Sequence, residues 1–249
     1  YSALMNNTNG ANNSAFGSSA LEKNTTGHQN NAFGIFSLHF NTTGQNNVAM
    51  GTSTLYWNTI GQDNVAFGNT ALFYNDTGDF NVAVGAESLY DNTTGNDNVA
   101  VGKSALSNNI SGNDNTALGY QSLFTSTTGN GNVSLGRGSL YLNTTGSYNV
   151  AIGHNALISN TSGFHNIAIG AGALNSNTNG GSNVAIGSNS DVANGVNYGT
   201  AIGPDSYVAQ SYSLVLGSTP GVNLGSTTYV GIGTTTPQTI LDVTGFNVN

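Results

Sequence analysis

Carboxylates are the side chains of this 249-residue chain best suited to chemistry, and three of them share one spacing. Asp97 and Asp114 are seventeen residues apart, and Asp63 precedes Asp97 by thirty-four. Paired carboxylates can act as acid and base in glycoside cleavage, or they can bind Ca²⁺. The same spacing also brings Asn, Phe, Gly, Tyr, His and Ser to equivalent positions. We therefore interpret the position as a solvated surface and predict a non-enzymatic protein without catalytic residues.

The remaining titratable residues give no metal or cofactor motif. The histidines each occupy a different phase of the repeat described below, without the pairing that a metal site requires: His28, His39, His154 and His165. Cysteine is absent, which excludes disulfides and thiolate ligands. The glycines do not form a phosphate-binding G-x-x-x-x-G-K-[ST] loop. We expect no metal and no cofactor.

Asn-Thr-Thr and Asn-Thr-Ser triplets are formal acceptors for N-glycosylation. Five of them recur at one phase of the repeat: Asn24, Asn41, Asn92, Asn143 and Asn160. A recurring turn explains this pattern first, although modification would present sugars in rows. A flat threonine face would resemble an ice-binding surface, but these corners are expected to be bent.

Aromatic residues follow a leucine in successive units of the chain. They are Tyr56, Trp57, Tyr74 and Tyr90, together with Phe73, Phe124 and Tyr141. Bands of aromatic side chains can stack on sugar rings, or they can pack at a seam between chains. Both interpretations stay open, and we favour the seam.

All these positions belong to a repeat of seventeen residues. Glycine recurs at this spacing from Gly17 to Gly187, and a second glycine column runs from Gly10 to Gly180. Leucine recurs from Leu4 to Leu174, and asparagine from Asn13 to Asn183. A short fixed period means that each unit adopts one local structure and stacks on its copies.

Each unit predicts two short strands and two corners. Val150, Ala151 and Ile152 alternate as a strand does, and Asn155–Ile158 is interpreted as a second strand. Gly153 and the turn at 160–163 form the corners. The sequence thus predicts an all-β, parallel β-solenoid (a β-roll) of about eleven 17-residue coils over 1–187. Shorter coils are expected over 188–217 and a C-terminal connector over 218–249.

Stacking converts each column into a ladder. Leucines are expected to fill the core, among them Leu55, Leu72, Leu89, Leu106 and Leu157. Stacked asparagines can pass amide hydrogen bonds from coil to coil; this structural ladder includes Asn47, Asn64, Asn81, Asn98, Asn149 and Asn166.

The first strand is apolar on both faces, with Val and a large apolar residue on one side and Ala on the other. A strand of this kind is buried on both faces. One narrow coil cannot cover its own outer face, so we expect further copies of the chain to do so. A homotrimer around a common axis is the expected assembly.

Several segments carry a family resemblance. Asn183–Gly187, Thr200–Gly203 and Ser213–Gly217 resemble the head repeat of YadA-type trimeric autotransporter adhesins, which is echoed again at Ile202–Ala209. This resemblance implies a left-handed parallel β-roll and an obligate trimer, although the 17-residue unit departs from that family's shorter repeat. Tyr229–Pro237, followed by Leu241-Asp242-Val243, is similar to the V-G-I-G-T-x-x-P-x-x-x-L-D-V connector of phage-type tail fibres and bacterial surface or injection-system fibres.

The composition of the chain limits the classes of partner that it can bind. The chain has 3 Lys+Arg against 11 Asp+Glu and a net charge of -8. Few cations are available to neutralise phosphates or to bind an anionic bilayer, and no apolar run approaches the length of a membrane span. We expect no nucleic-acid partner and no membrane insertion. The start at Tyr1, in the middle of a unit, indicates a piece of a longer fibre.

The expected function is that of an extracellular structural fibre at a cell surface or on a virion or injection system. It would be the shaft or head of a tail fibre or adhesin, attaching to a cell-surface glycan or protein receptor. The alternative is a self-assembling extracellular filament whose subunits stack end to end. A glycan-cleaving spike is the third and least favoured interpretation.

Overall fold

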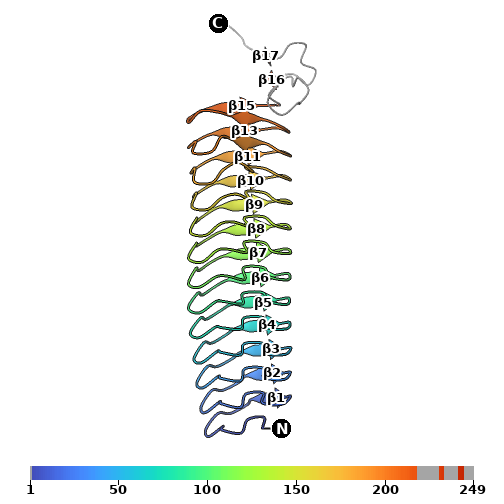
Figure 1. The fold of residues 1–249 in the computed structure, drawn as a ribbon, viewed down its shortest axis with the longest axis vertical. Coiled ribbons are helices and arrows are strands. Elements are labelled where there is room, and N and C mark those ends of the chain that lie inside the picture. The colour runs from blue at the N-terminus through green and yellow to red at the C-terminus, as the bar shows by residue number, and fades with distance from the viewer. Residues whose placement is uncertain (1, 218–229, 233–240, 244–249) are drawn as a thin grey trace.

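The computed structural model describes residues 2–217, 230–232 and 241–243, and over 2–217 the chain winds into a rod of stacked coils (Figure 1). The described residues form strands and turns without a helix. The fold is therefore all-β and a parallel β-solenoid, as the repeat predicts.

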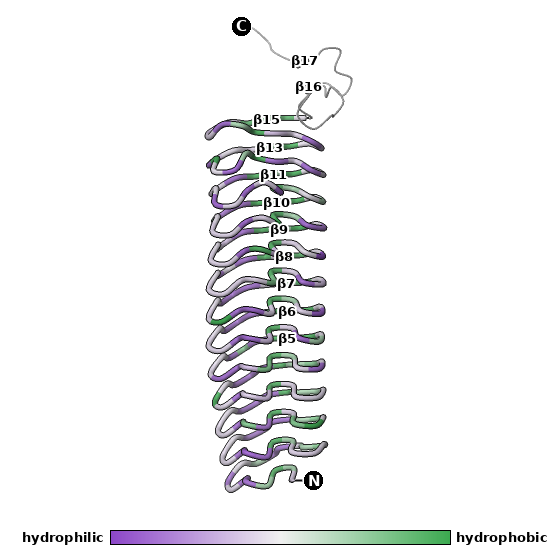
Figure 2. Tube along the Cα trace, in the orientation of Figure 1, coloured by the Kyte–Doolittle hydropathy of each residue, from purple (hydrophilic) through white to green (hydrophobic). Residues whose placement is uncertain are grey.

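One 13-stranded parallel sheet runs the length of the solenoid, with one strand per coil. Its strands are β1 (Ser14–Phe16), β2 (Asn31–Phe33), β3 (Val48–Met50), β4 (Val65–Phe67), β5 (Val82–Val84), β6 (Val99–Val101), β7 (Thr116–Leu118), β8 (Val133–Leu135), β9 (Val150–Ile152), β10 (Ile167–Ile169), β11 (Val184–Ile186), β13 (Thr200–Ile202) and β15 (Leu214–Leu216). Each strand pairs in register with its copy, so that Val65 lies beside Val82 and Ala66 beside Ala83. Identical residues therefore form columns along the rod, and Figure 2 shows the same hydropathy pattern returning in successive coils.

The strand alternates as its sequence predicts. Ala151 and the preceding Asn149 are fully buried, whereas Val150 is half-buried and Ile152 is exposed. The small alanine faces a narrow interior, where it packs with the leucine column in one continuous core. The large apolar residues at the strand ends face outwards.

The prediction of a second strand at Asn155–Ile158 is wrong for the 17-residue coils. This segment is a series of turns, because Asn155 and Leu157 have φ angles of 55° and 53°. The left-handed conformation costs about 1–2 kcal/mol for a residue with a Cβ. Two features offset that cost: the leucine side chain is fully buried, and its amide donates to a carbonyl of the next coil, as from Leu157 to Ala173 at 2.8 Å.

The two corners use glycine for different reasons. Gly153 has a φ of 134°, a region that favours glycine. Gly163 has no such angle, but a Cβ there would lie 2.5 Å from the carbonyl oxygen of Gly180 in the next coil. The first corner therefore needs a glycine conformation, and the second needs a glycine-sized residue.

The strand spacing shortens after Gly187: Val184 pairs with Thr200, and Thr200 with Leu214. Here a second strand does form on the other side of the core, as β12 (Asp191–Val192) pairs in parallel with β14 (Tyr207–Val208). Most of the connector expected over 218–249 lies outside the described residues. Its described parts, β16 (Val230–Ile232) and β17 (Leu241–Val243), pair in parallel.

Candidate functional site

The carboxylates that could have formed a catalytic pair lie on adjacent coils at the surface. Asp97 and Asp114 are exposed and have φ angles of 57° and 59°, and Asp63 accepts a hydrogen bond from the Asn46 amide at 3.0 Å. Every residue in this column is left-handed, a conformation that Asn, Asp and Gly tolerate best. The left-handed backbone therefore explains why aspartate occurs in this column. Among the described residues, no group of three or more His, Asp or Glu side chains is placed to hold a metal ion.

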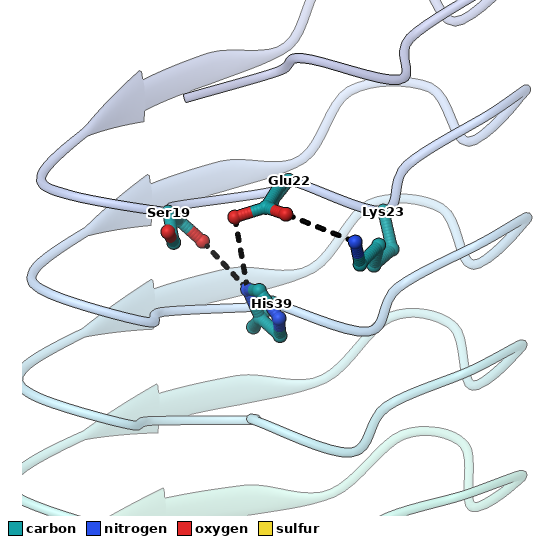
Figure 3. A network of polar contacts seen from close by, with 4 residues as sticks. All are labelled: Ser19, Glu22, Lys23 and His39. Atoms are coloured by element: carbon teal, nitrogen blue, oxygen red, sulfur yellow. Dashed lines mark hydrogen bonds and ion pairs between the residues drawn. The ribbon is translucent and has the colours of Figure 1, made fainter. Parts of the chain in front are cut away.

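The histidines are dispersed along the rod. His39 lies against Glu22, with 3.9 Å between Nδ1 and Oε2, and the same nitrogen is 3.0 Å from the Ser19 carbonyl oxygen (Figure 3). The side chain of Ser19 and then that of Lys23 hydrogen-bond to Glu22 and lower the pKa of its carboxyl group. This cluster forms one end of the aromatic column described below.

The remaining histidines make separate contacts. His28 accepts a hydrogen bond from the Ala11 amide at 3.0 Å, and His165 stacks on Tyr148. His154 lies in a different column, at the surface. The structure thus brings no two histidines together.

The predicted asparagine ladder lies inside the solenoid. Asn64 donates from both its backbone nitrogen and its Nδ2 to Oδ1 of Asn47, and its Nδ2 also donates to the Gly78 carbonyl oxygen. The same pattern of bonds recurs at Asn81, Asn98, Asn149 and Asn166. Each buried amide is therefore satisfied by the coils on either side of it, which avoids the cost of an unpaired polar group. The predicted core leucines Leu55, Leu72, Leu89, Leu106 and Leu157 are fully buried beside this ladder.

A second asparagine ladder occupies the Asn-Thr-Thr corner. Asn41 donates from Nδ2 to Oδ1 of Asn24 at 2.7 Å and to the Gly44 carbonyl oxygen at 3.1 Å. The five Asn-Thr-Thr and Asn-Thr-Ser acceptors belong to this ladder and are fully buried: Asn24, Asn41, Asn92, Asn143 and Asn160. The nitrogen that would carry a glycan is thus enclosed and hydrogen-bonded. Their strict spacing is the sequence signal for this ladder.

Two kinds of surface remain, and they lie on either side of the core. The first, here called the strand stripe, consists of the outward residues at both ends of each strand in the 13-stranded sheet. Its exposed members include Phe16, Met50, Val99, Leu118, Ile152, Ile167, Ile169, Ile186, Ile202 and Leu216. The stripe is continuous because the strands are in register from β1 to β15.

The second surface, here called the ring columns, consists of the two positions after each leucine. Tyr56 stacks between His39 and Phe73 with centroid separations of 5.2 and 5.0 Å, and Phe73 stacks on Tyr90 at 5.2 Å. Phe40 and Trp57 stack in the neighbouring column at 3.9 Å. The structure thus brings the predicted aromatic residues together as stacks along the rod.

Contacts between the two ring columns are edge to face. Tyr56 meets Trp57 in this way at 5.4 Å, and Tyr74 meets Tyr90 at the same separation. Burial, and then the nearby Tyr74, raise the pKa of Tyr90. Because leucine and the strand alanine enter the core from opposite sides, the ring columns face away from the strand stripe.

In the described residues, no helix has the length and apolar character needed to cross a bilayer. Comparison with protein families and with curated protein sequences finds no match for this chain.

Proposed function

We propose that this chain is a segment of a homotrimeric extracellular fibre, serving as the shaft or head of a tail fibre or adhesin that attaches to a surface receptor. The single observation that carries the proposal is the strand stripe, an unbroken apolar band that follows the rod. Contiguous exposed apolar surface of this extent marks an interaction site. A rod built of backbone ladders and in-register columns also suits a mechanical task more than catalysis.

A second copy of the chain is the partner that best matches the stripe. Apolar side chains recur in every coil along the whole length, so a partner must offer apolar groups at the same spacing over the same distance. A parallel copy meets this condition by its own construction, and rotational symmetry around one axis lets every copy cover its stripe. Three copies are the smallest such arrangement that encloses a central core, and the adhesin resemblance implies the same number.

Mass measurement in solution tests the assembly. Light scattering coupled to size exclusion should give three chains of 25.3 kDa in one particle. Leu118→Asp places a charge on the stripe and should yield monomers, whereas Ile110→Asp places the same charge at a corner and should leave the trimer intact. The two side chains are matched, with exposed fractions of 48% and 47%. A wild-type monomer would overturn the proposal, and a polymer of variable length would favour the end-to-end filament instead.

A further inference from the structure

The ring column next to the leucines has a vacant place between Tyr90 and Phe124. Rings stack in an unbroken series up to Tyr90, and stacking resumes from Phe124 to Tyr141 at 5.3 Å. Ser107 holds the position in between. Two coil spacings separate the flanking residues, about 10 Å, which leaves room for one more ring at the spacing that the column already uses.

The structure has a hollow of about 480 Å³ at this place, here called the Ser107 hollow. Its volume lies within the range of small-molecule sites. The residues that matter for recognition are Tyr90, Phe124, Ser107, Glu87, Lys103 and Gln121. Tyr90 and Phe124 thus bound the hollow along the rod axis, and polar side chains line the remainder together with Tyr120.

Several polar groups in the hollow are free to bind a ligand. Ser107 is 7% exposed as a residue and lines the hollow. Glu87 accepts a hydrogen bond from Ser104 through Oε2 at 2.9 Å, and its Oε1 makes no such contact. Lys103 forms no ion pair in residues 2–217. The Ser107 hydroxyl is not enclosed in the way that the unpaired Ser126 hydroxyl is, so it is accessible to a ligand in the hollow.

We propose that the Ser107 hollow binds a single hexopyranose ring with equatorial hydroxyls, a glucose-type unit of a surface glycan. A chair pyranose of this configuration presents C–H groups on both faces and hydroxyls around its edge. The faces match the rings of Tyr90 and Phe124, and the edge hydroxyls match the side chains of Ser107, Glu87 and Lys103. An axial hydroxyl would point at an aromatic face and lose its hydrogen bond there.

Charge and hydrogen bonding favour a neutral sugar over a charged ligand and over an aromatic side chain. One carboxylate and one ammonium line the hollow, a balance that suits a neutral sugar. An aromatic side chain from another protein would stack equally well. It would, however, leave the hydroxyl, carboxylate and ammonium groups without partners, at a cost in binding free energy.

The hollow remains open in the proposed assembly, because it lies across the core from the strand stripe. The inference deepens the proposed attachment role, on which its biological meaning rests, by naming the class of ligand. Sugar binding and chain mass are separate measurements. A trimer that binds no sugar and a monomer that binds sugar are therefore distinguishable failures.

Saturation-transfer NMR with methyl β-glucoside tests the proposal, and methyl β-galactoside and methyl α-mannoside provide axial comparisons. We expect the glucoside to bind and the two axial sugars to bind about tenfold more weakly. Ser107→Phe fills the vacant place with the ring type found in neighbouring coils and should abolish the signal without lowering the melting temperature. Tyr90→Ala should weaken binding about tenfold.

Asn108→Phe is the matched control, because the same ring enters the neighbouring column, which already holds Phe40 and Trp57. Binding should persist in this variant. Loss of binding in both phenylalanine variants, or unchanged binding in Ser107→Phe, would overturn the assignment. Absence of glucoside binding to the wild-type chain would do the same, as would binding of indole in place of any sugar.

Discussion

The 17-residue coils and the shorter coils after Gly187 share one side of the solenoid and differ on the other. Both continue the same sheet in register, with Ala185 beside Ala201. On the other side, the long coils place the fourth residue after the corner glycine in a left-handed conformation and bury it as leucine. In the short coils that residue, Asp191 or Tyr207, is part of a strand, and the fifth residue is the one that is fully buried, as Val192 or Val208.

The difference follows from side-chain branching. Leucine branches at Cγ and tolerates a positive φ at moderate cost, whereas valine branches at Cβ and is a genuine outlier there. In the short coils the fourth residue after the corner glycine is extended instead of left-handed. Because strand side chains alternate, the side chain that points into the core is then that of the fifth residue. The strand stripe continues through the long and the short coils, whereas the structure of the opposite side of the solenoid changes. The strand stripe is thus the surface that both kinds of coil keep, and it is where the proposed partner chains would pack.

The largest expected effect is at the corner glycines. Gly102→Ala adds a Cβ 2.6 Å from the Gly119 carbonyl oxygen at a φ of 130°. We expect a loss of about 4 kcal/mol in the free energy of unfolding. In the short coils, Gly203→Ala meets its nearest atom, Gly217 Cα, at 3.0 Å and should lose about half as much. Chemical denaturation followed by circular dichroism measures both, and equal losses would contradict a difference between the regions.

Leucine branching can be tested directly. Leu106→Val should cost about 2–3 kcal/mol, from one lost methylene and from strain at a φ of 51°. Leu106→Met keeps the volume and lacks Cβ branching, and it should cost less than about 1.5 kcal/mol. Amide hydrogen exchange in the coils next to residue 106 reports the local effect. A valine variant as stable as the methionine variant would remove the branching explanation.

The parts of this fold that the sequence predicts are those that follow from the repeat of residues in columns. In-register stacking of the strand that contains residues such as Ala66 and Ala83 follows from their fixed spacing, although the sequence also predicts a second strand in each coil. The left-handed leucine does not follow from it, because leucine has no intrinsic preference for that conformation and only its neighbours impose it. The aromatic residues after leucine are visible in the sequence. The hollow at Ser107 does not follow from the sequence, because it is recognised only from the spacing between the rings in three dimensions.

The second asparagine ladder offers a stabilising change. Ser126 interrupts it, which leaves Asn109 Oδ1 and the Ser126 hydroxyl buried without partners. Ser126→Asn should restore both contacts and raise the free energy of unfolding by about 1 kcal/mol. Ser126→Asp has the same shape but no amide donor, so it should destabilise the rod. Thermal unfolding compares the two variants, and a fall in melting temperature with asparagine would contradict the ladder.

The ladder also marks the boundary between the two regions. Asn177 is its last member, and its Oδ1 is buried without a partner because the next coil is shorter. The long coils thus depend on an inner polar ladder that the short coils lack. Ser126→Asn should therefore increase amide protection around residues 109 and 143 and leave the coils after Gly187 unchanged.

The smallest expected effect is a pH dependence at that boundary. Asp191 Oδ1 accepts hydrogen bonds from the backbone nitrogens of Val192 at 2.9 Å and Ser176 at 3.3 Å, joining the last long coil to the first short one. Burial raises the pKa of its carboxyl group above the usual 3.8, and these hydrogen bonds oppose the shift only in part. The folded state therefore holds a proton that the unfolded state releases between the two pKa values.

Stability of this boundary should then be greatest below pH 3.8 and should fall as the pH rises through the raised pKa. Asp191→Asn keeps the acceptor oxygen without the charge, so it should flatten this dependence and stabilise the short coils at neutral pH. Hydrogen exchange of residues 191–208 as a function of pH measures it, and Asp114→Asn controls for the loss of one surface charge. If Asp191→Asn instead weakened protection at neutral pH, the ionised carboxylate would be the stabilising form, and the boundary would be held by charge-assisted bonds stronger than the cost of burial.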